Sequence, residues 1–148
     1  MEKITIENIQ AEWDIDCEMD GNNLDLESVK SAKLHAKYID LYTTTKLKLN
    51  SSIAEKDILR GNLVKLFNGY MSPQELIKLE WDQWQKNVPN KYLMEELLKG
   101  DQRTIDLKLK VEYLEATLYL LDSILKVING RSFHINNFIK HRSFITGM

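Results

Sequence analysis

The sequence predicts a mainly α-helical fold. Seven apolar residues recur at alternating gaps of four and three, which is the heptad pattern of one long amphipathic helix. Helix start and stop signals flank other periodic apolar segments, and strand signals are few. The seven residues of this heptad seam are Leu107, Val111, Leu114, Leu118, Leu121, Leu125 and Ile128.

The length and composition favour one domain covering residues 1–148. Apolar residues make up 43% of the 148 positions and charged residues 28%, which is typical of a globular protein. No apolar run approaches the roughly 18 residues that a membrane span needs. The N-terminus lacks the features of a secretory signal, and Cys17 has no cysteine partner. These features predict a cytoplasmic protein that does not contact a membrane.

The first half of the chain predicts two helices. Residues 5–13 place apolar side chains on one stripe and predict a short helix. A long helical pattern begins near Ser28, which suits an N-cap, and it ends at Asn68 and Gly69, where a left-handed residue would stop it. An acidic N-terminal segment (1–27) is thus followed by a basic helical region (28–69).

The second half predicts three more helices. Ser72, Pro73 and Glu75 stand in the order of a capping box, which predicts a helix over about 73–86. The seam helix should stop at Asn129-Gly130, with Ser132 capping a final helix. This divides the rest of the chain into a helical connector (70–103) and a C-terminal helical assembly region (104–148).

Charge is distributed unevenly along the chain. Residues 1–27 contain nine acids and one lysine, whereas residues 28–148 carry a net charge of +6. Residues 123–148 contain no Asp or Glu at all. Such asymmetry points to an anionic partner for the body of the protein and to an acidic segment that competes with or regulates it.

Residues 16–27 match part of a calcium-loop template, with acids at positions 1, 3 and 5, Gly at 6 and Glu at 12. Position 3 is Glu18, the apolar eighth position is Asn23, and no second loop exists. A solvated acidic connector without a metal is therefore the favoured interpretation. The chain has no nucleophile elbow, Walker-type loop or HExxH motif, so we expect neither an enzyme nor a cofactor.

The basic helical region suits a surface that follows nucleic-acid phosphates. Residues 30–65 carry a net charge of +5, although an ordinary solvated helix face gives the same pattern. Trp13, Trp81 and Trp84 have side chains that can stack on bases, but packing in a core or interface is the favoured role of each.

Three stretches together resemble the UvsY family of recombination mediators from large tailed myophages. They are "IENIQAEW", "LHAKYIDLY" and "LKVEYLEATLYLLDSILKVINGRSFHINNFIKHRSFITG". The resemblance covers most of the chain and is weakest over 70–100. It implies a non-enzymatic, ring-forming homo-oligomer of six or seven subunits in the cytoplasm of a phage-infected bacterium. It also implies binding to single-stranded DNA and assistance to a RecA-like recombinase in displacing the single-strand-binding protein.

The resemblance also suggests where DNA binds. "LRGNL", at 59–63, is the nearest match to the family's DNA-contact motif, with Arg60 in the first basic place and Asn62 where the family has arginine. Lys65 would supply the missing charge. The predicted DNA-binding residues are Lys46, Lys48, Lys56, Arg60, Lys65, Arg131, Lys140 and Arg142.

The heptad seam and the amphipathic final helix predict self-assembly, which the family's C-terminal region performs. The main alternative to a DNA-binding mediator is a structural helical scaffold or adaptor whose charges serve solubility. The predicted assembly residues are the seven of the seam together with Ile135, Phe138 and Ile139.

Overall fold

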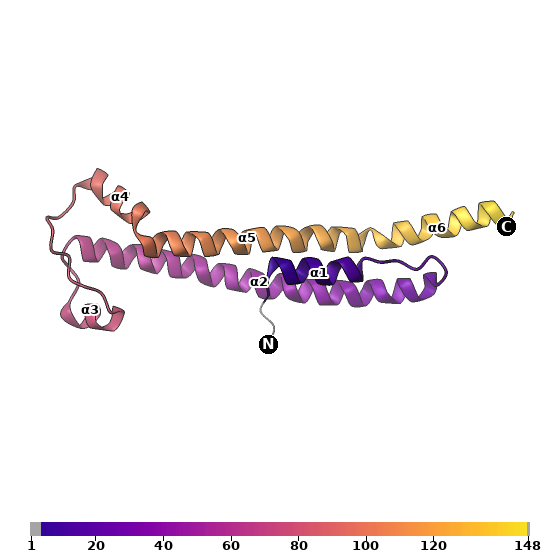
Figure 1. The fold of residues 1–148 in the computed structure, drawn as a ribbon, viewed down its shortest axis with the longest axis horizontal. Coiled ribbons are helices and arrows are strands. Elements are labelled where there is room, and N and C mark those ends of the chain that lie inside the picture. The colour runs from indigo at the N-terminus through magenta and orange to yellow at the C-terminus, as the bar shows by residue number, and fades with distance from the viewer. Residues whose placement is uncertain (1–3, 148) are drawn as a thin grey trace. The chain divides into compact units, whose positions relative to one another are not determined.

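Helices joined by loops make up the part of the chain that the computed structural model describes, residues 4–147 (Figure 1). No strand occurs in that range, so the prediction of a mainly α-helical fold is confirmed. None of the helices formed by these residues is long and apolar enough to span a membrane. The helices are α1 (Ile6–Asp16), α2 (Leu24–Phe67), α3 (Pro73–Leu79), α4 (Lys91–Gly100), α5 (Gln102–Asn129) and α6 (Arg131–Thr146).

The chain forms two compact units. The first unit comprises the described residues up to Leu47 and from Leu114 onward, and the second comprises Lys48–Tyr113. The first unit is therefore discontinuous in sequence, whereas the second is a single stretch inserted into it. Helices α2 and α5 each contribute residues to both units.

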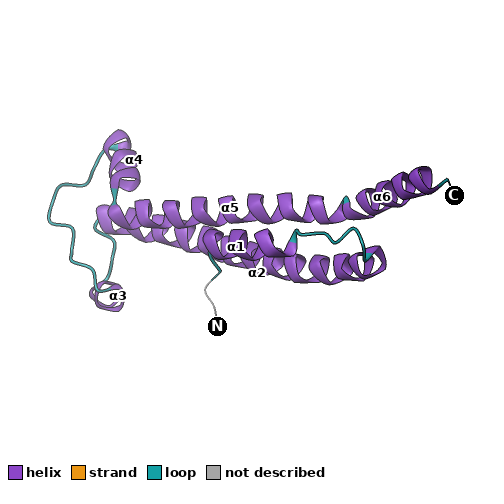
Figure 2. Cartoon of the chain, turned by 45° about the vertical axis from the view of Figure 1, so that its right-hand side comes forward, coloured by secondary structure: helices purple, strands orange, loops and turns teal. Residues whose placement is uncertain are grey.

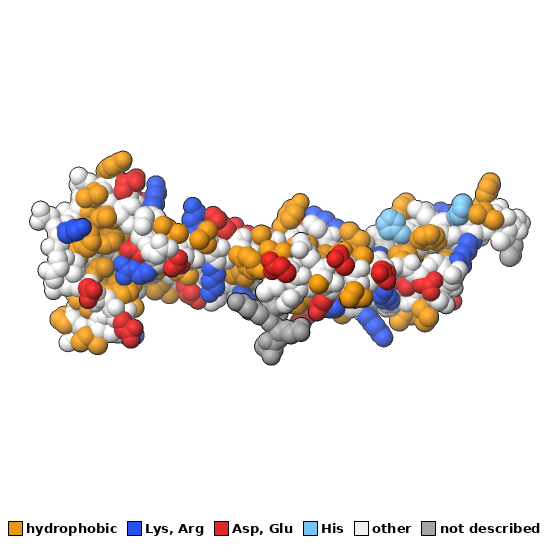
Figure 3. All heavy atoms as spheres, viewed as in Figure 1, with side chains coloured by type: hydrophobic (Ala, Val, Ile, Leu, Met, Phe, Trp, Pro, Cys, Tyr) orange, Lys and Arg blue, Asp and Glu red, His pale blue; other side chains and the backbone are white. Residues whose placement is uncertain are grey.

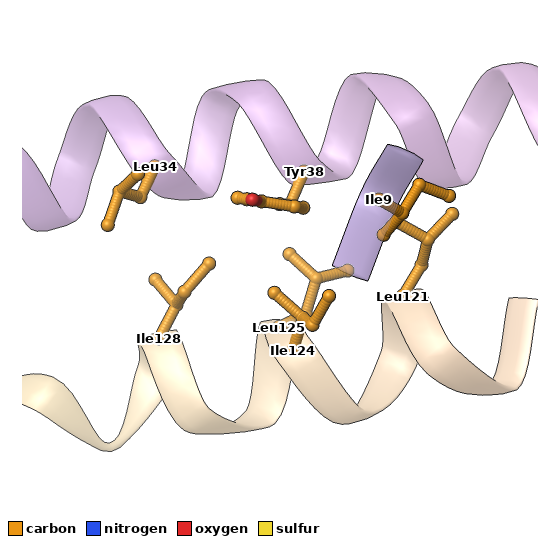
Figure 4. Packing of buried hydrophobic residues seen from close by; sticks show 7 residues of the cluster. All are labelled: Ile9, Leu34, Tyr38, Leu121, Ile124, Leu125 and Ile128. Carbon is orange, nitrogen blue, oxygen red and sulfur yellow. The ribbon is translucent and has the colours of Figure 1, made fainter. Parts of the chain in front are cut away.

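The core of the first unit forms where three helices meet. Figure 4 shows Leu34 and Tyr38 of α2 pointing toward α5, with Ile9 of α1 beside them. Leu121 and Tyr38 are fully excluded from solvent. Burying a leucine of this kind contributes roughly 1.5–3 kcal/mol, so these contacts supply much of the unit's stability. The α5 residues of the core are Leu121, Ile124, Leu125 and Ile128.

Most of the predicted assembly residues are already covered within one chain. Val111, Leu118 and Ile135 are buried, and Leu107 and Leu114 are partly buried. Only Phe138 and Ile139, each 47% exposed, remain on the surface among the predicted set. The role of the seam in assembly stays a prediction, and its C-terminal half has an intramolecular role in the core.

A polar network borders this core. The Oδ2 atom of Asp16 accepts hydrogen bonds from Lys37 Nζ at 2.7 Å and from the Tyr38 hydroxyl at 2.9 Å. Burial opposes ionisation of Asp16, but these two hydrogen bonds and the positive charges of Lys37 and Lys30 together lower the pKa of the carboxyl. Burial, followed by the bond to Asp16, raises the pKa of Tyr38. Trp13 packs edge-on against Tyr38 with ring centroids 5.4 Å apart, so this tryptophan has the predicted packing role.

Two predicted helix boundaries are confirmed by their local chemistry. Gly69 adopts a φ of +73°, which ends α2 as the Asn-Gly pair predicts. Ser72 accepts a hydrogen bond from the Glu75 N–H, and the Glu75 carboxylate accepts one from the Ser72 N–H. The predicted capping box therefore starts α3.

Other boundaries differ from the predictions. Helix α2 begins at Leu24, one turn before Ser28, and α3 ends at Leu79 rather than near 86. Helix α5 does end at Asn129, where the sequence predicts its stop, although Gly130 is right-handed there, with φ −80° and ψ −9°. Gly130 also precedes α6 directly, without a side-chain cap, so Ser132 lies inside that helix.

Helix α4 was not predicted. Its N-cap Asn90 accepts a hydrogen bond from the Leu93 N–H at 2.8 Å. In the sequence, Val88 and Pro89 indicated only the end of the preceding helix, and Asn90 was not considered as the start of another. Figure 2 shows the loop that separates α3 from α4. In the second unit, Leu98 of α4 packs with Leu63, Leu66 and Phe67 of α2.

Replacing Leu121 by Ala should lower the free energy of unfolding by about 2–5 kcal/mol, because the substitution leaves a cavity in a fully buried site. Urea unfolding followed by circular dichroism measures this. Leu109→Ala is the matched control on the same helix, since Leu109 is 57% exposed and its removal should cost much less. Equal effects of the two substitutions would contradict the proposed core.

Asp16→Asn should destabilise the protein by about 1 kcal/mol at pH 7, because it removes the charged acceptor of two hydrogen bonds. A carboxyl whose pKa is lowered by folding stabilises the protein above its unfolded value of 3.8 and loses this effect as the pH falls through the folded value. Urea titrations at several pH values should therefore show the difference in unfolding free energy between the two proteins shrinking as the pH falls below 3.8. Asp14→Asn, at an exposed position of α1, should show no such trend.

Candidate nucleic-acid interface

A basic cleft lies in the second unit, between α2, α4 and α5. Its volume is about 380 Å³, and it contains four cationic side chains and one carboxylate, that of Asp57. The cations come from three helices, so the second unit's fold brings together charges that are distant in sequence. These four cations of the basic cleft are Lys56, Arg60, Lys99 and Lys108.

The cations of the basic cleft are accessible to a ligand. Arg60 donates from Nη2 to Glu95 Oε1 at 3.0 Å, but both side chains are about half exposed. Such a pair contributes at most about 1 kcal/mol, so a phosphate can compete with Glu95. Lys56, Lys99 and Lys108 form no salt bridge with any residue in 4–147. The cleft therefore presents a net positive potential to an anion.

Sequence reasoning identified half of this group. Lys56 and Arg60 lie one turn apart on α2 and belong to the predicted basic helical region. Lys99 and Lys108 were missed because they lie outside residues 30–65 and join the cleft only through the packing of α4 and α5. Lys99 lies in the last turn of α4, so recognising that helix in the sequence would have drawn attention to this lysine.

Lys65 binds a carboxylate at the start of α3. Its Nζ atom donates to Glu75 Oε1 at 2.7 Å, and the same carboxylate closes the capping box. The hydrogen bond from Lys65, followed by that from the Ser72 N–H, lowers the pKa of Glu75. Lys65 is absent from the lining of the basic cleft.

The remaining predicted cations lie on α2 and α6. Lys46, Lys48 and Lys140 are exposed and make no salt bridge within the described part of the chain. Arg142 of α6 donates to the Gly21 carbonyl and, at 3.3 Å, to Asn22 Oδ1. Arg142 remains exposed, so its contacts leave it open to further partners.

Arg131 is enclosed by protein. It is 2% exposed, and its Nη2 atom lies 2.5 Å from Glu27 Oε2 while Nε donates to the Ser31 hydroxyl at 2.9 Å. A phosphate reaches this guanidinium only if the pair with Glu27 breaks. Arg131 is therefore not part of the proposed interface.

Three of the five acids in residues 16–27 have separate side-chain partners. Asp16 binds Lys37 and Tyr38, Asp20 accepts from the backbone and side chain of neighbouring asparagines, and Glu27 binds Arg131. Residues 4–147 contain no group of three or more His, Cys, Asp or Glu side chains placed to hold a metal ion. The expected solvated connector is only partly correct, because Asp16 and Glu27 are structural.

The helical fold and the cation-lined cleft are the features of a class of proteins that bind polyanions. The family model described as "Recombination, repair and ssDNA binding protein UvsY" matches residues 12–148, and the chain belongs to this family. The resemblance noted in the sequence is thereby confirmed. The family is one of recombination, repair and single-stranded-DNA-binding proteins. It is not a known class of enzymes.

Solved structures with a similar fold include crystal structures of the bacteriophage T4 recombination mediator protein UvsY. The lattice type II structure has a TM-score of 0.83 and 19% identity, covering 97% of this chain and 99% of that one. The type IV structure has a TM-score of 0.81 and 18% identity, with coverages of 95% and 99%. The type I structure has a TM-score of 0.80 and 19% identity, with coverages of 93% and 98%. No curated protein sequence matches the chain.

Arg131→Met should lower the free energy of unfolding by about 3–5 kcal/mol, because it leaves the carboxylate of Glu27 buried without a counter-charge. The double variant Glu27→Leu/Arg131→Met should cost less than the sum of its single changes. Chemical denaturation of all three variants measures this. Arg60→Met removes the exposed ion pair and should cost under about 1 kcal/mol; a similar cost for Arg131→Met would refute the structural role.

Proposed function

We propose that this chain is a recombination mediator. It binds single-stranded DNA and promotes the loading of a RecA-like recombinase onto DNA covered by single-strand-binding protein, in the cytoplasm of a phage-infected bacterium. The observation that carries this proposal is the basic cleft, which contains Arg60 of the "LRGNL" motif. Family membership and the fold shared with the T4 mediator support the same function.

DNA binding in this proposal depends on phosphate contacts. Lysine and arginine side chains neutralise phosphates and release counterions, which gives affinity that tolerates any base sequence. Lys56, Lys99 and Lys108 are free of salt bridges within the described residues, and Arg60 has only an exposed partner. Lys46, Lys48, Lys140 and Arg142 extend the set as weaker contributors, because they lie outside this cleft.

Homo-oligomerisation is part of the proposal, with a ring of six or seven subunits. Helix α6 leaves large apolar side chains on the surface, and orange side chains are visible over it in Figure 3. Large apolar side chains exposed in this number on one helix favour a protein interface. The exposed apolar residues of α6 are Phe133, Phe138, Ile139, Phe144 and Ile145.

The ring would make weak clefts effective. Several clefts on one assembly act at high effective concentration, so the strand is held strongly overall. Each cleft still releases singly, since its phosphate contacts are individually weak. A mediator needs both properties, because it must hold the strand and then yield it to the recombinase.

The double variant Lys56→Ala/Lys108→Ala should weaken binding of fluorescent oligonucleotides to a similar degree for every base sequence. The slope of log affinity against log salt should flatten by about 0.7 for each phosphate that the variant no longer neutralises. A salt titration followed by fluorescence anisotropy measures both effects. Recombinase filament assembly on DNA coated with single-strand-binding protein should slow in parallel.

The matched control is Lys78→Ala/Lys91→Ala, which removes the same charge from exposed positions outside the cleft. Superimposed titrations of the two double variants would show that the cleft is not the DNA site. Absence of oligonucleotide binding by the unmodified protein at low salt would instead favour the structural scaffold.

A further inference from the structure

A second cavity in the second unit shares no lining residue with the basic cleft. Its volume is about 670 Å³, and it lies between the end of α2, residues 80–84 after α3, and the junction of α4 with α5. Trp81 and Trp84 line it, and Phe67 packs at 65° against Trp84 with ring centroids 4.7 Å apart. The Trp84 indole N–H donates to the Asn87 carbonyl at 3.2 Å, so its ring is held in place. We call this the tryptophan cavity.

The tryptophan cavity is acidic. Its lining contains Glu80, Asp82, Glu96 and Asp101 against the single cation Arg103. The first three acids form no salt bridge within residues 4–147. A net charge of −3 repels phosphates, so this cavity does not suit a nucleic-acid strand despite its tryptophans. The carboxylates do not converge on one point, and no metal-binding group of three exists in the described chain.

The cavity already holds one guanidinium, that of Arg103. The Arg103 Cζ atom lies 4.2 Å from the centroid of the Trp81 ring. Its Nε and Nη2 atoms each donate to Asp101 at 2.8 Å, and these bonds lower the pKa of Asp101. An indole face below and a carboxylate in plane are the two contacts that recognise an arginine side chain. Arg103 is therefore an intramolecular example of how the cavity lining binds a guanidinium.

Glu80 stands at the C-terminal end of α3. It has a φ of +58°, and it is the one residue other than glycine with positive φ in the described range. Glycine would adopt this conformation without strain, whereas glutamate pays a steric cost. Here Glu80 is the left-handed C-cap of α3, and its N–H donates to carbonyls of the last turn, so the conformation ends the helix and leaves the carboxylate on the cavity lining.

We propose that the tryptophan cavity is a docking site for an arginine or lysine side chain presented by a basic peptide segment of a partner protein. The incoming cation takes the place of Lys86, whose Nζ atom lies 5.6 Å from the centroid of the Trp84 ring. It pairs with one carboxylate among Glu80, Asp82 and Glu96. Exposed apolar side chains of α3 and α4, seen in Figure 3, extend the contact surface beside the cavity. This site is separate from the DNA cleft and does not depend on its function.

The test uses a fluorescein-labelled nonapeptide of alternating Arg and Ala, titrated with the full chain in a polarisation assay. Glu80→Gln/Asp82→Asn should weaken binding at least tenfold. The control Glu112→Gln/Glu115→Gln removes the same charge from exposed positions of α5 and should change affinity less than twofold. Equal weakening by both variants would show that binding reflects overall charge and would overturn the proposal.

Three further measurements distinguish a basic peptide from the other possible occupants of the tryptophan cavity. Glu80→Gly should weaken binding of the peptide while leaving the melting temperature of the protein equal or higher, which excludes unfolding as the cause. Lys56→Ala/Lys108→Ala should leave peptide affinity unchanged. The cavity variant should retain full oligonucleotide affinity and the native mass of the assembly. Loss of oligonucleotide binding would identify a nucleic-acid site instead, and a reduced mass would identify a second copy of the chain as the occupant.

Discussion

The buried ion pair between Arg131 and Glu27 fixes the arrangement of the first unit. Because both side chains are almost excluded from water, neither charge is tolerable without the other. The same two residues also bind Ser31 and the Asp20 N–H, so one pair joins the start of α6, the first turns of α2 and the loop after α1. Arg142 binds that loop a second time from further along α6. Apolar packing supplies the stability of the unit, and this pair determines where α6 begins.

The same interaction accounts for the charge asymmetry of the sequence. Acids concentrate near the N-terminus and are absent from residues 123–148, which pointed to an anionic partner. In the folded first unit, Glu27 neutralises Arg131, while Asp16 and Glu12 neutralise Lys37. Part of the apparent preference for an anion is therefore satisfied within the chain. Arg131 and Arg142 bind the acid-free tail to the acidic segment, whereas three of the four cations of the basic cleft form no salt bridge within residues 4–147.

Local chemistry determined which features were predictable from the sequence. The heptad seam, the capping box at Ser72 and the stop at Gly69 depend on residues close in sequence, and all three appear as predicted. The Ser28 and Ser132 caps failed because tertiary contacts extend α2 and α6 beyond their local signals. Lys99 and Lys108 join Arg60 only through the packing of three helices, and no spacing in the sequence encodes that meeting. The tryptophan cavity was unpredictable for the same reason.

Under the proposed function, the basic cleft compensates for Asn62 in the "LRGNL" stretch. The resemblance places an arginine at the position of Asn62, and Lys65, the substitute suggested by the sequence, is hydrogen-bonded to Glu75. Lys99 and Lys108 bring two charges to the cleft of Arg60 from α4 and α5. A phosphate responds to the positive potential in the cleft and not to the position of a cation in the sequence. A charge missing from one helix can thus be replaced from its neighbours, which lets a phosphate-binding surface persist while the motif itself changes.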